Sequence, residues 1–430
     1  MKQTKLPVYL MLLATLSAGS CSNEDTPDTP YNPSNDPDAV ELGITAGVAL
    51  TKSAINEGTD DTNFESIAVY AVGATTSYTT GNNYALYTKS GNWTNTGTDK
   101  IYLTNETATI YGYHPAYKPN NGVMKTSGTA LKIKEASPSA NATIDISVFE
   151  SSDSGDANNK YPTDINNADK IYSSTWSENT ANKGKIISAP GEVDYMYAVK
   201  SDSETDQPTA SNGKKASGTP TANANEVSLK MKHALAMVSF RIYNDGTYAN
   251  TGSLTKIKLS NTSTNKDLSK GTNPTMKIKD GSITENAAIA ANYYRFIDGG
   301  YTIIKKGNLP SATIATSEDE AKQGAKKFSI LVLPSTTANA ANIQATFTID
   351  GAEYTVPLGS AGTVNWAKGT NTLYTAKLSG KELTLSSVTV EGWGDGAATG
   401  ELPVNEELKV TFPLSRGGRG CVIAQPYNKL

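Results

Sequence analysis

Alternation of apolar and polar residues is the strongest pattern in this chain, and it predicts β-strands instead of helices. The clearest case lies near the N-terminus, where every second residue is apolar: Val40, Leu42, Ile44, Ala46, Val48 and Leu50. Successive side chains of a strand point to opposite faces, so this segment predicts a first strand with one wholly apolar face. Short strand-like runs follow at the close spacing that is typical of a β-sandwich.

The chain divides at a polar stretch between residues 201 and 225, which contains hardly any large apolar residues. Its Ser, Thr, Asn, Gly and Pro content is typical of linkers and turns. We therefore expect an N-terminal β-sandwich over residues 40–222, a C-terminal β-sandwich over 223–395 and a tail over 396–430. Sustained helical periodicity is hard to find, so the predicted fold class is all-β.

The tail repeats the pattern of the first strand. Its apolar residues Leu408, Val410, Phe412 and Leu414 recur at a spacing of two. Pro413 lies on the opposite face and removes one backbone donor, so the segment suits the edge of a sheet. A detached segment with one apolar face is an incomplete structural unit, because nothing beside it in the sequence covers that face.

The N-terminus has the three parts of a secretion signal. Lys2 and Lys5 form a basic start, residues 6–16 are mostly apolar, and small residues lead into Cys21, which predicts a signal over residues 1–20. The apolar run has about half the ~20 residues that a membrane-spanning helix needs, so we expect its removal. A cysteine directly after Ala-Gly-Ser resembles the lipobox of bacterial lipoproteins, which implies acylation of Cys21. The alternative is an ordinary signal peptide with an incidental cysteine.

Residues 21–39 predict a disordered, solvated tether. The segment from Ser22 to Asp38 holds four prolines and almost nothing apolar, so it cannot bury enough surface to offset the entropy of ordering. Its acidic start, Asn23-Glu24-Asp25, resembles the export signal that sends some lipoproteins to the outer leaflet of the outer membrane. The plain alternative is that acidic residues are common in tethers.

Composition excludes one class of partner and supports a secreted protein. The net charge is only −4 and no basic cluster occurs, so the chain lacks the electrostatic footprint of nucleic-acid binding. Cys421 is the only cysteine besides Cys21, so lipidation of Cys21 excludes an intramolecular disulfide. Tyr far outnumbers Phe, and Thr, Asn and Gly are abundant, as expected for half-exposed strands and turns.

Several short segments, none of them specific alone, follow one another in a recognisable order. In the N-terminal half they are TKSA at 51–54, NWTNTGTDKIYL around Trp93, IYGYHPAY at 110–117 and DYMYA at 194–198. In the C-terminal half they are LKMKHALAMVSFRI at 229–242, LVLPS at 331–335, DGAEY at 350–354, NWAKGTNTLYTAKL around Trp366 and LTLSSVTVEGW ending at Trp393. In this order they resemble the fimbrillin family, the lipoprotein-derived subunits of type V pili in Gram-negative gut and oral anaerobes.

The resemblance implies two tandem β-sandwich domains of transthyretin-like Greek-key topology, and subunits that assemble by strand exchange. In the family a protease removes the first strand, and a strand of the next subunit fills the vacated groove by β-augmentation. Here the exchanged strand would be the Val40 to Leu50 segment, and the Leu408 to Leu414 segment is a candidate donor strand. The implied partners are other pilus subunits and, through Cys21, outer-membrane lipid.

The processing site departs from the family pattern. Family members are cut after an arginine that follows the first strand, but no arginine precedes Arg241 in this chain. Lys52, followed by Ser53, stands at the matching place and is the candidate processing site. Either a protease that accepts lysine cuts there, or the subunit stays uncut and serves as an anchor or accessory component.

Residues with candidate catalytic or metal-binding chemistry are few. The only histidines, His114 and His233, fall in different predicted domains, so we expect both to be structural. The Asp153, Asp156 and Asp164 stretch is acidic but lacks the ligand spacing and the closing Glu of a calcium loop. No nucleophile elbow is present. We therefore predict no catalytic, cofactor or metal site.

The tryptophans leave sugar binding open as an alternative function. Trp93, Trp176, Trp366 and Trp393 could stack on sugars, although aromatic residues of sandwiches more often pack in the core or at an edge.

Three functions remain: a pilus subunit that mediates adhesion, a non-polymerising surface lipoprotein that binds glycan or host ligands, and a hydrolase. The order of the segments favours the first, a non-enzymatic protein of the fimbrium and the outer-membrane surface.

Overall fold

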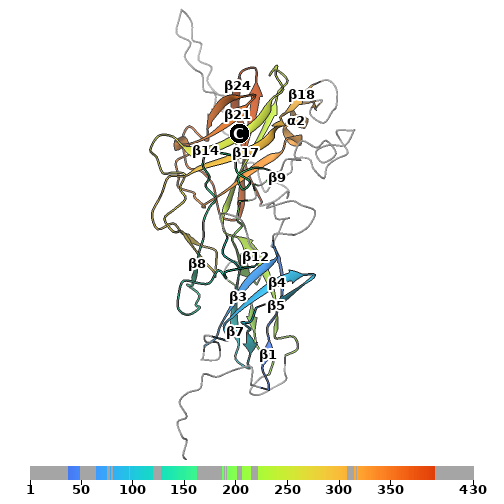
Figure 1. Cartoon of the computed structure of the whole chain (residues 1–430), viewed down its shortest axis with the longest axis vertical. Helices are drawn as coiled ribbons and strands as arrows, with labels where there is room; N and C mark the ends of the chain where they lie inside the picture. The colour runs from blue at the N-terminus through green and yellow to red at the C-terminus, as the bar shows by residue number, and fades with distance from the viewer. Residues whose placement is uncertain are drawn as a thin grey trace, which may run out of the picture.

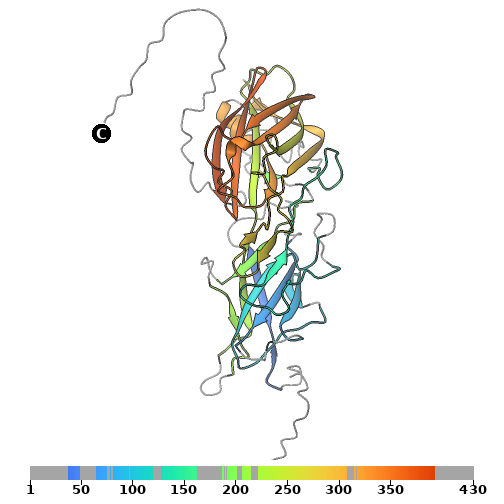
Figure 2. The same cartoon turned by 90° about the vertical axis from the view of Figure 1, so that its left-hand side faces the viewer.

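The protein is almost entirely β, which confirms the predicted fold class. The computed structural model describes residues 37–48, 64–74, 78, 81–95, 97–119, 127–161, 186–187, 189, 191–200, 206–214, 221–307, 314–315 and 317–392. Figure 1 shows two bodies of sheet stacked along the long axis, and Figure 2 shows the same division from the side. In the described part, helix is limited to α2 (Glu318–Gly324) and the 3-10 turn η3 (Ala340–Asn342).

The lower body is built on one large sheet. Its order is β2 (Gly43–Val48), β12 (Glu226–His233), β10 (Met196–Val199), β7 (Ala108–His114), β3 (Ser66–Val72), β4 (Tyr84–Ser90) and β5 (Asn92–Asn95), and β11 (Thr209–Ala210) also pairs with β7. Alternate side chains such as Ile67, Ile110 and Leu229 point to one shared, fully buried core. The sheet curls, because its two end strands β2 and β5 lie beside each other.

The upper body is a sandwich of two sheets. One sheet runs β17 (Asn292–Thr302), β14 (Ser253–Asn261), β21 (Ile343–Ile349) and β22 (Ala352–Pro357). The other is centred on β13 (Ala236–Asn244), which pairs with β20 (Lys327–Val332), β18 (Ile304–Lys306) and β23 (Thr370–Ser379); β19 (Ile314–Ala315), β9 (Ile186–Ile187) and β24 (Glu382–Gly392) extend it. Phe240 of β13 meets Phe347 of β21 edge-on at 5.4 Å between the sheets.

A small three-stranded sheet lies where the two bodies meet. It consists of β8 (Thr143–Asp145), β15 (Thr275–Lys277) and β16 (Ile283–Thr284). Tyrosines of the lower sheet, among them Tyr113 and Tyr197, share a buried core there with Met276 and with Leu331 of β20. The outer face of the lower sheet is therefore covered by residues from both halves of the chain.

The two halves of the sequence also exchange elements. β12 follows the predicted boundary at residue 222, yet it lies in the lower sheet, and the chain passes to β13 through the buried residues Ala234 and Leu235. In the opposite sense, β9 pairs in parallel with β20 of the upper body. The division into domains at residue 222 stays a prediction, and the sheets show that strands of each half contribute to both bodies.

A buried ion pair holds one of these crossings in place. Glu192 and Arg295 are both fully buried, and Arg295 Nε donates to Glu192 Oε1 at 2.8 Å. Glu192 Oε2 accepts from the backbone N–H of Leu331 at 2.9 Å, and Arg295 Nη2 donates to the carbonyl of Phe149 at 2.9 Å. Burial raises the pKa of Glu192, against the attraction of Arg295. These bonds tie residues 149 and 192 to β17 and β20.

Candidate assembly surface on the first strand

The first strand of the protein changes partners along its length. Its start, β1 (Val40–Glu41), pairs antiparallel with β6 (Tyr102–Leu103). From Gly43 to Val48 it continues as β2, which pairs in parallel with β12. At the switch, Leu42 N donates to the carbonyl of Ile101 and Gly43 N donates to the carbonyl of Asn225, both at 2.9 Å. The strand thus joins a short β-ladder to the edge of the lower sheet.

Burial along this strand follows the alternation in its sequence. Leu42 and Ile44 are buried and Ala46 is half-buried, whereas Thr45 and Gly47 are exposed. Val40 departs from the pattern with 36 % exposure, because it pairs at the rim with the short β6. The side chains of Val48 and Leu50 lie outside the described residues. The apolar face of this strand is therefore inserted mainly through Leu42 and Ile44.

The groove that receives these side chains is the core of the lower body. Leu42 and Ile44 belong to the same buried cluster as Ile67, Val69, Tyr87, Ile101, Leu103, Ile110, Leu229 and Met231. Space in this cluster is tight at Gly112, where a Cβ atom would lie 3.1 Å from both Ala198 Cβ and Leu229 Cδ1. The absence of a Cβ atom at this position leaves room for the side chains of Ala198 on β10 and Leu229 on β12.

Three side chains hold the first strand by its backbone carbonyls. Tyr87 Oη donates to the carbonyl of Leu42 at 2.6 Å, and Trp93 Nε1 donates to that of Ala46 at 3.1 Å. Asn225 Nδ2 donates to the carbonyl of Glu41 at 3.3 Å. Burial raises the pKa of the Tyr87 hydroxyl, which therefore stays protonated and able to donate. Every residue has a backbone carbonyl, so these contacts do not depend on the side chains of the strand.

Two further contacts involve Glu41, at the start of the strand, and the Trp93 ring, which donates to the carbonyl of Ala46. Glu41 forms an ion pair with Lys100 at 2.7 Å, and this hydrogen bond with Glu41 raises the pKa of Lys100. Both side chains are more than a third exposed, so the pair contributes little to stability. Trp93 packs edge-on against the buried ring of Phe64 at 5.2 Å, which orients its indole N–H toward Ala46.

The two histidines lie closer together than the sequence analysis expected. His114 of β7 and His233 of β12 both pair with Met196 of β10, from opposite sides of that strand. His233 Nδ1 lies 2.8 Å from Asp194 Oδ2, and His114 Nδ1 lies 2.7 Å from the carbonyl of Ser66. Among the described residues, no three His, Cys, Asp or Glu side chains are arranged to hold a metal ion.

The acidic stretch makes separate contacts at each described aspartate. Asp156 Oδ1 accepts from the backbone N–H of Asn158 at 2.7 Å and of Asn159 at 3.2 Å, and so stabilises a turn. Asp153 forms an ion pair with Lys256 at 3.3 Å. Asp164 lies outside the described residues. The two described carboxylates therefore serve different partners and do not form a shared cation site.

The two described tryptophans lie in different bodies of the protein. Trp93 donates from Nε1 to the Ala46 carbonyl of the first strand. Trp366 is buried in the upper core and donates from Nε1 to Tyr374 Oη at 3.1 Å. Trp176 and Trp393 lie outside the described residues. Trp93 and Trp366 do not form a common sugar-stacking surface.

Comparison with known proteins decides the family. The sequence profile of the fimbrillin-like family matches residues 51–393, which is most of the chain. The chain belongs to the fimbrillin-like family. No curated protein matches its sequence at a significant level.

Solved structures give alignments over most of this fimbrillin-like chain. A fimbrial protein from Bacteroides vulgatus is 14 % identical, with coverage of 82 % of this chain and 99 % of that one and a TM-score of 0.44. A candidate cell adhesion protein from Bacteroides uniformis is 15 % identical, with coverage of 83 % and 99 % and a TM-score of 0.44. A fimbrial assembly protein from Parabacteroides distasonis is 10 % identical, with coverage of 82 % and 96 % and a TM-score of 0.30.

Several residues that the sequence analysis singled out in this fimbrillin-like chain lie outside the described residues. They are Cys21, Lys52, Ser53, Leu50 and the tail residues Leu408, Val410, Phe412 and Leu414. Sequence reasoning in turn missed Tyr87, Asn225 and the parallel partner β12. Trp93 belonged to a family-like segment, but nothing in the sequence indicated that its N–H binds the first strand. Within the described part, no helix is long and apolar enough to cross a bilayer.

Proposed function

We propose that this chain is a structural subunit of a cell-surface pilus, which polymerises by strand exchange and takes part in adhesion. Membership of the fimbrillin-like family supports the pilus role. The observation that carries the exchange step is the way the first strand is held: Tyr87, Trp93 and Asn225 all donate to its backbone carbonyls. A groove built in this manner accepts any strand whose alternating side chains fit.

The energetics of the groove favour replacement of the strand over an empty state. Removal of residues 40–50 would leave the Tyr87 hydroxyl without its carbonyl partner and β12 without its neighbour β2. Buried donors that lose their partners cost about 1–3 kcal/mol each, and the side chains around Leu42 and Ile44 would be exposed to water. A strand from a neighbouring subunit would satisfy both needs at once by β-augmentation.

Residues toward the two ends of the chain would take the remaining roles in assembly and anchoring. Cleavage after Lys52 would release the first strand, and the segment with Leu408, Val410, Phe412 and Leu414 would be donated to the next subunit. Acylation of Cys21 would anchor the uncut chain in the outer membrane, with residues 21–39 as tether. The proposed role is non-enzymatic and needs no cofactor.

Lysine-specific limited proteolysis of the mature chain tests the exchange step. We expect the cut protein to form polymers that are visible by electron microscopy and elute early in size exclusion, while uncut protein stays monomeric. A Lys52→Gln variant is the control, since it should resist release of the first strand. A chain that is cut at Lys52 and remains a stable monomer would contradict polymerisation and favour a non-polymerising surface lipoprotein.

A further inference from the structure

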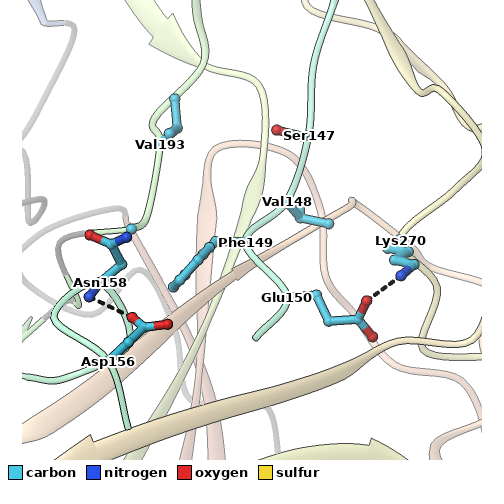
Figure 3. Close-up of a pocket in the computed structure, with 9 residues that line it drawn as sticks. Ser147, Val148, Phe149, Glu150, Asp156, Asn158, Val193 and Lys270 are labelled. Carbon is cyan, nitrogen blue, oxygen red and sulfur yellow. Dashed lines mark hydrogen bonds and ion pairs between the residues drawn. The ribbon is translucent and has the colours of Figure 1, made fainter. Parts of the chain in front are cut away.

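A cavity of about 570 Å³ lies beside the buried Glu192–Arg295 pair, away from the first-strand groove. Figure 3 shows its walls: the segment that contains Phe149, the turn with Asp156 and Asn158, Val193, and Lys270 on the far side. Sites for small ligands typically measure about 300–1,000 Å³, so the volume suits one or two rings of a ligand. None of the described residues that line it belongs to a strand.

The Phe149 ring, which lines the cavity between its two polar walls, is held by Arg295 and Gly191. Phe149 is half-buried, and the guanidinium carbon of the buried Arg295 lies 5.0 Å from its ring centroid. Arg295 Nη2 also donates to the Phe149 carbonyl at 2.9 Å. The ring lies so close to Gly191 that a Cβ atom there would be 2.4 Å from Phe149 Cε1. The backbone and the ring of Phe149 are therefore both held, with Gly191 against the ring, and Phe149 lies among the lining residues between the two polar walls (Figure 3).

One polar wall of the cavity is the turn at Asp156. Its Oδ1 accepts from the backbone N–H groups of Asn158 and Asn159, and the carbonyl of Asn158 accepts from Gly191 N at 2.9 Å. No described residue donates to Asp156 Oδ2. The turn is thus anchored on both sides of Asn158, with one carboxylate oxygen available as an acceptor.

The opposite wall is Glu150 with Lys270. Glu150 Oε1 accepts from the backbone N–H of Asn292 at 2.8 Å, and Oε2 is paired with Lys270 Nζ. Figure 3 shows this pair and the Asp156 turn on the two sides of the Phe149 ring. Both walls are positioned by bonds within the protein, so a ligand would meet polar groups that are already ordered, which lowers the cost of binding.

We infer that this cavity is a binding site for a neutral saccharide. The C–H groups of a sugar ring are apolar and can pack against the part of the Phe149 ring that stays exposed, and its peripheral hydroxyls both donate and accept, as the Asp156 and Glu150–Lys270 walls require. Lys270 balances Glu150 and Arg295 balances Glu192, so Asp156 leaves the site slightly negative and unfavourable for acidic sugars. An extended peptide would bind by adding to a strand edge, and the described lining residues provide none.

The site is tested on the full mature chain, uncut and monomeric. An array of immobilised neutral oligosaccharides of hexoses and N-acetylhexosamines, with acidic glycans and extended peptides on the same slide, identifies the best probe. Isothermal titration calorimetry then compares three variants with that probe. Asp156→Asn keeps an Oδ1 that can stabilise the turn but replaces the other oxygen with a donor. Asp153→Asn is the matched control, in the same loop but outside the cavity.

We expect Asp156→Asn to weaken binding about tenfold or more and Phe149→Ala to abolish it, with Asp153→Asn unchanged. Unchanged melting temperature in Asp156→Asn would show that its loss of affinity is not loss of fold. Three outcomes would overturn the inference: no neutral oligosaccharide bound by the wild type, preference for acidic glycans or peptides, or equal affinity in wild type and Asp156→Asn. Polymerisation after cleavage should be the same in all variants, so the result is independent of the proposed assembly role.

Discussion

Tyr87 and Leu42 are 45 residues apart in the sequence, and the hydroxyl of Tyr87 donates to the carbonyl oxygen of Leu42 at 2.6 Å. This bond links the buried face of β4 to the first strand across the core of the lower body. Since it recognises a carbonyl and not a side chain, it binds the strand without reading its sequence. The same holds for Trp93 and Ala46. The structure thus gives the first strand a specific position with contacts that another strand could reproduce.

Removal of the Tyr87 hydroxyl should loosen the first strand. We expect Tyr87→Phe to lower the free energy of unfolding by about 1–3 kcal/mol, because the Leu42 carbonyl loses its donor inside the core. After cleavage at Lys52, the variant should release residues 40–50 faster than wild type, as followed by mass spectrometry. Tyr102→Phe, at a half-buried position on β6, is the control and should change neither value. Equal release rates in Tyr87→Phe and wild type would show that the bond from Tyr87 to the Leu42 carbonyl does not retain the strand.

The inward register of the first strand can be tested by two adjacent charges. Ile44 is 7 % exposed in the core, and the next residue, Thr45, is exposed. Ile44→Asp should lower the free energy of unfolding by about 3 kcal/mol or more, since it buries a charge without a partner, whereas Thr45→Asp should be nearly neutral. Thermal unfolding followed by circular dichroism measures both. Similar losses from the two substitutions would refute this register.

Local pattern foretold the faces of the strands, but not their long-range partners. The alternation at Leu42 and Ile44 was enough to place both in a core, because side-chain direction in a strand depends only on position. The pairing of β2 with β12 joins segments about 180 residues apart, and no local periodicity encodes it. For the same reason, His114 and His233 were expected in different domains, although they flank Met196 in one sheet. The Tyr87 bond leaves no signal in the sequence, because its acceptor is a backbone carbonyl, which every residue carries.

Buried His114 makes the stability of the lower body depend on pH. Burial lowers its pKa, opposed by the Ser66 carbonyl and Asp194, while the nearby His233 lowers it further. The unfolded chain therefore binds more protons than the folded one just below pH ~6.5, and stability falls as the pH drops through this range. Urea unfolding at about pH 7.5 and 5.5 should show a smaller loss for His114→Gln than for wild type, by up to about 1.4 kcal/mol per pH unit. Buried Glu192 has a raised pKa and acts in the opposite direction at lower pH, and it is present in both proteins. An identical loss in the two proteins would exclude His114 as the source.

The proposed lipid anchor would depend on one thiol, that of Cys21. Cys21→Ala should abolish acylation, because no other residue at the end of the signal carries the nucleophile that the lipobox-like sequence presents. Metabolic labelling with a fatty-acid probe in a Gram-negative host that processes lipoproteins measures it, and cell fractionation follows retention in the outer membrane. Cys421→Ala is the matched control and should keep the label. Undiminished label in Cys21→Ala would show that the anchor lies elsewhere or is absent.

The donor strand can be tested with a peptide in place of a second subunit. A synthetic peptide of residues 406–416 should bind the chain after cleavage at Lys52, because Leu408, Val410, Phe412 and Leu414 could fill the positions that the first strand vacates. It should not bind the uncut chain, whose groove is occupied by Leu42 and Ile44. A peptide with Val410→Asp should fail to bind, since it would bury a charge, whereas Thr411→Asp on the opposite face should bind nearly as well. Fluorescence anisotropy of the labelled peptides gives the affinities. If both charged peptides bind equally, or if deletion of residues 406–430 leaves polymer formation intact, the groove takes its donor strand from another segment.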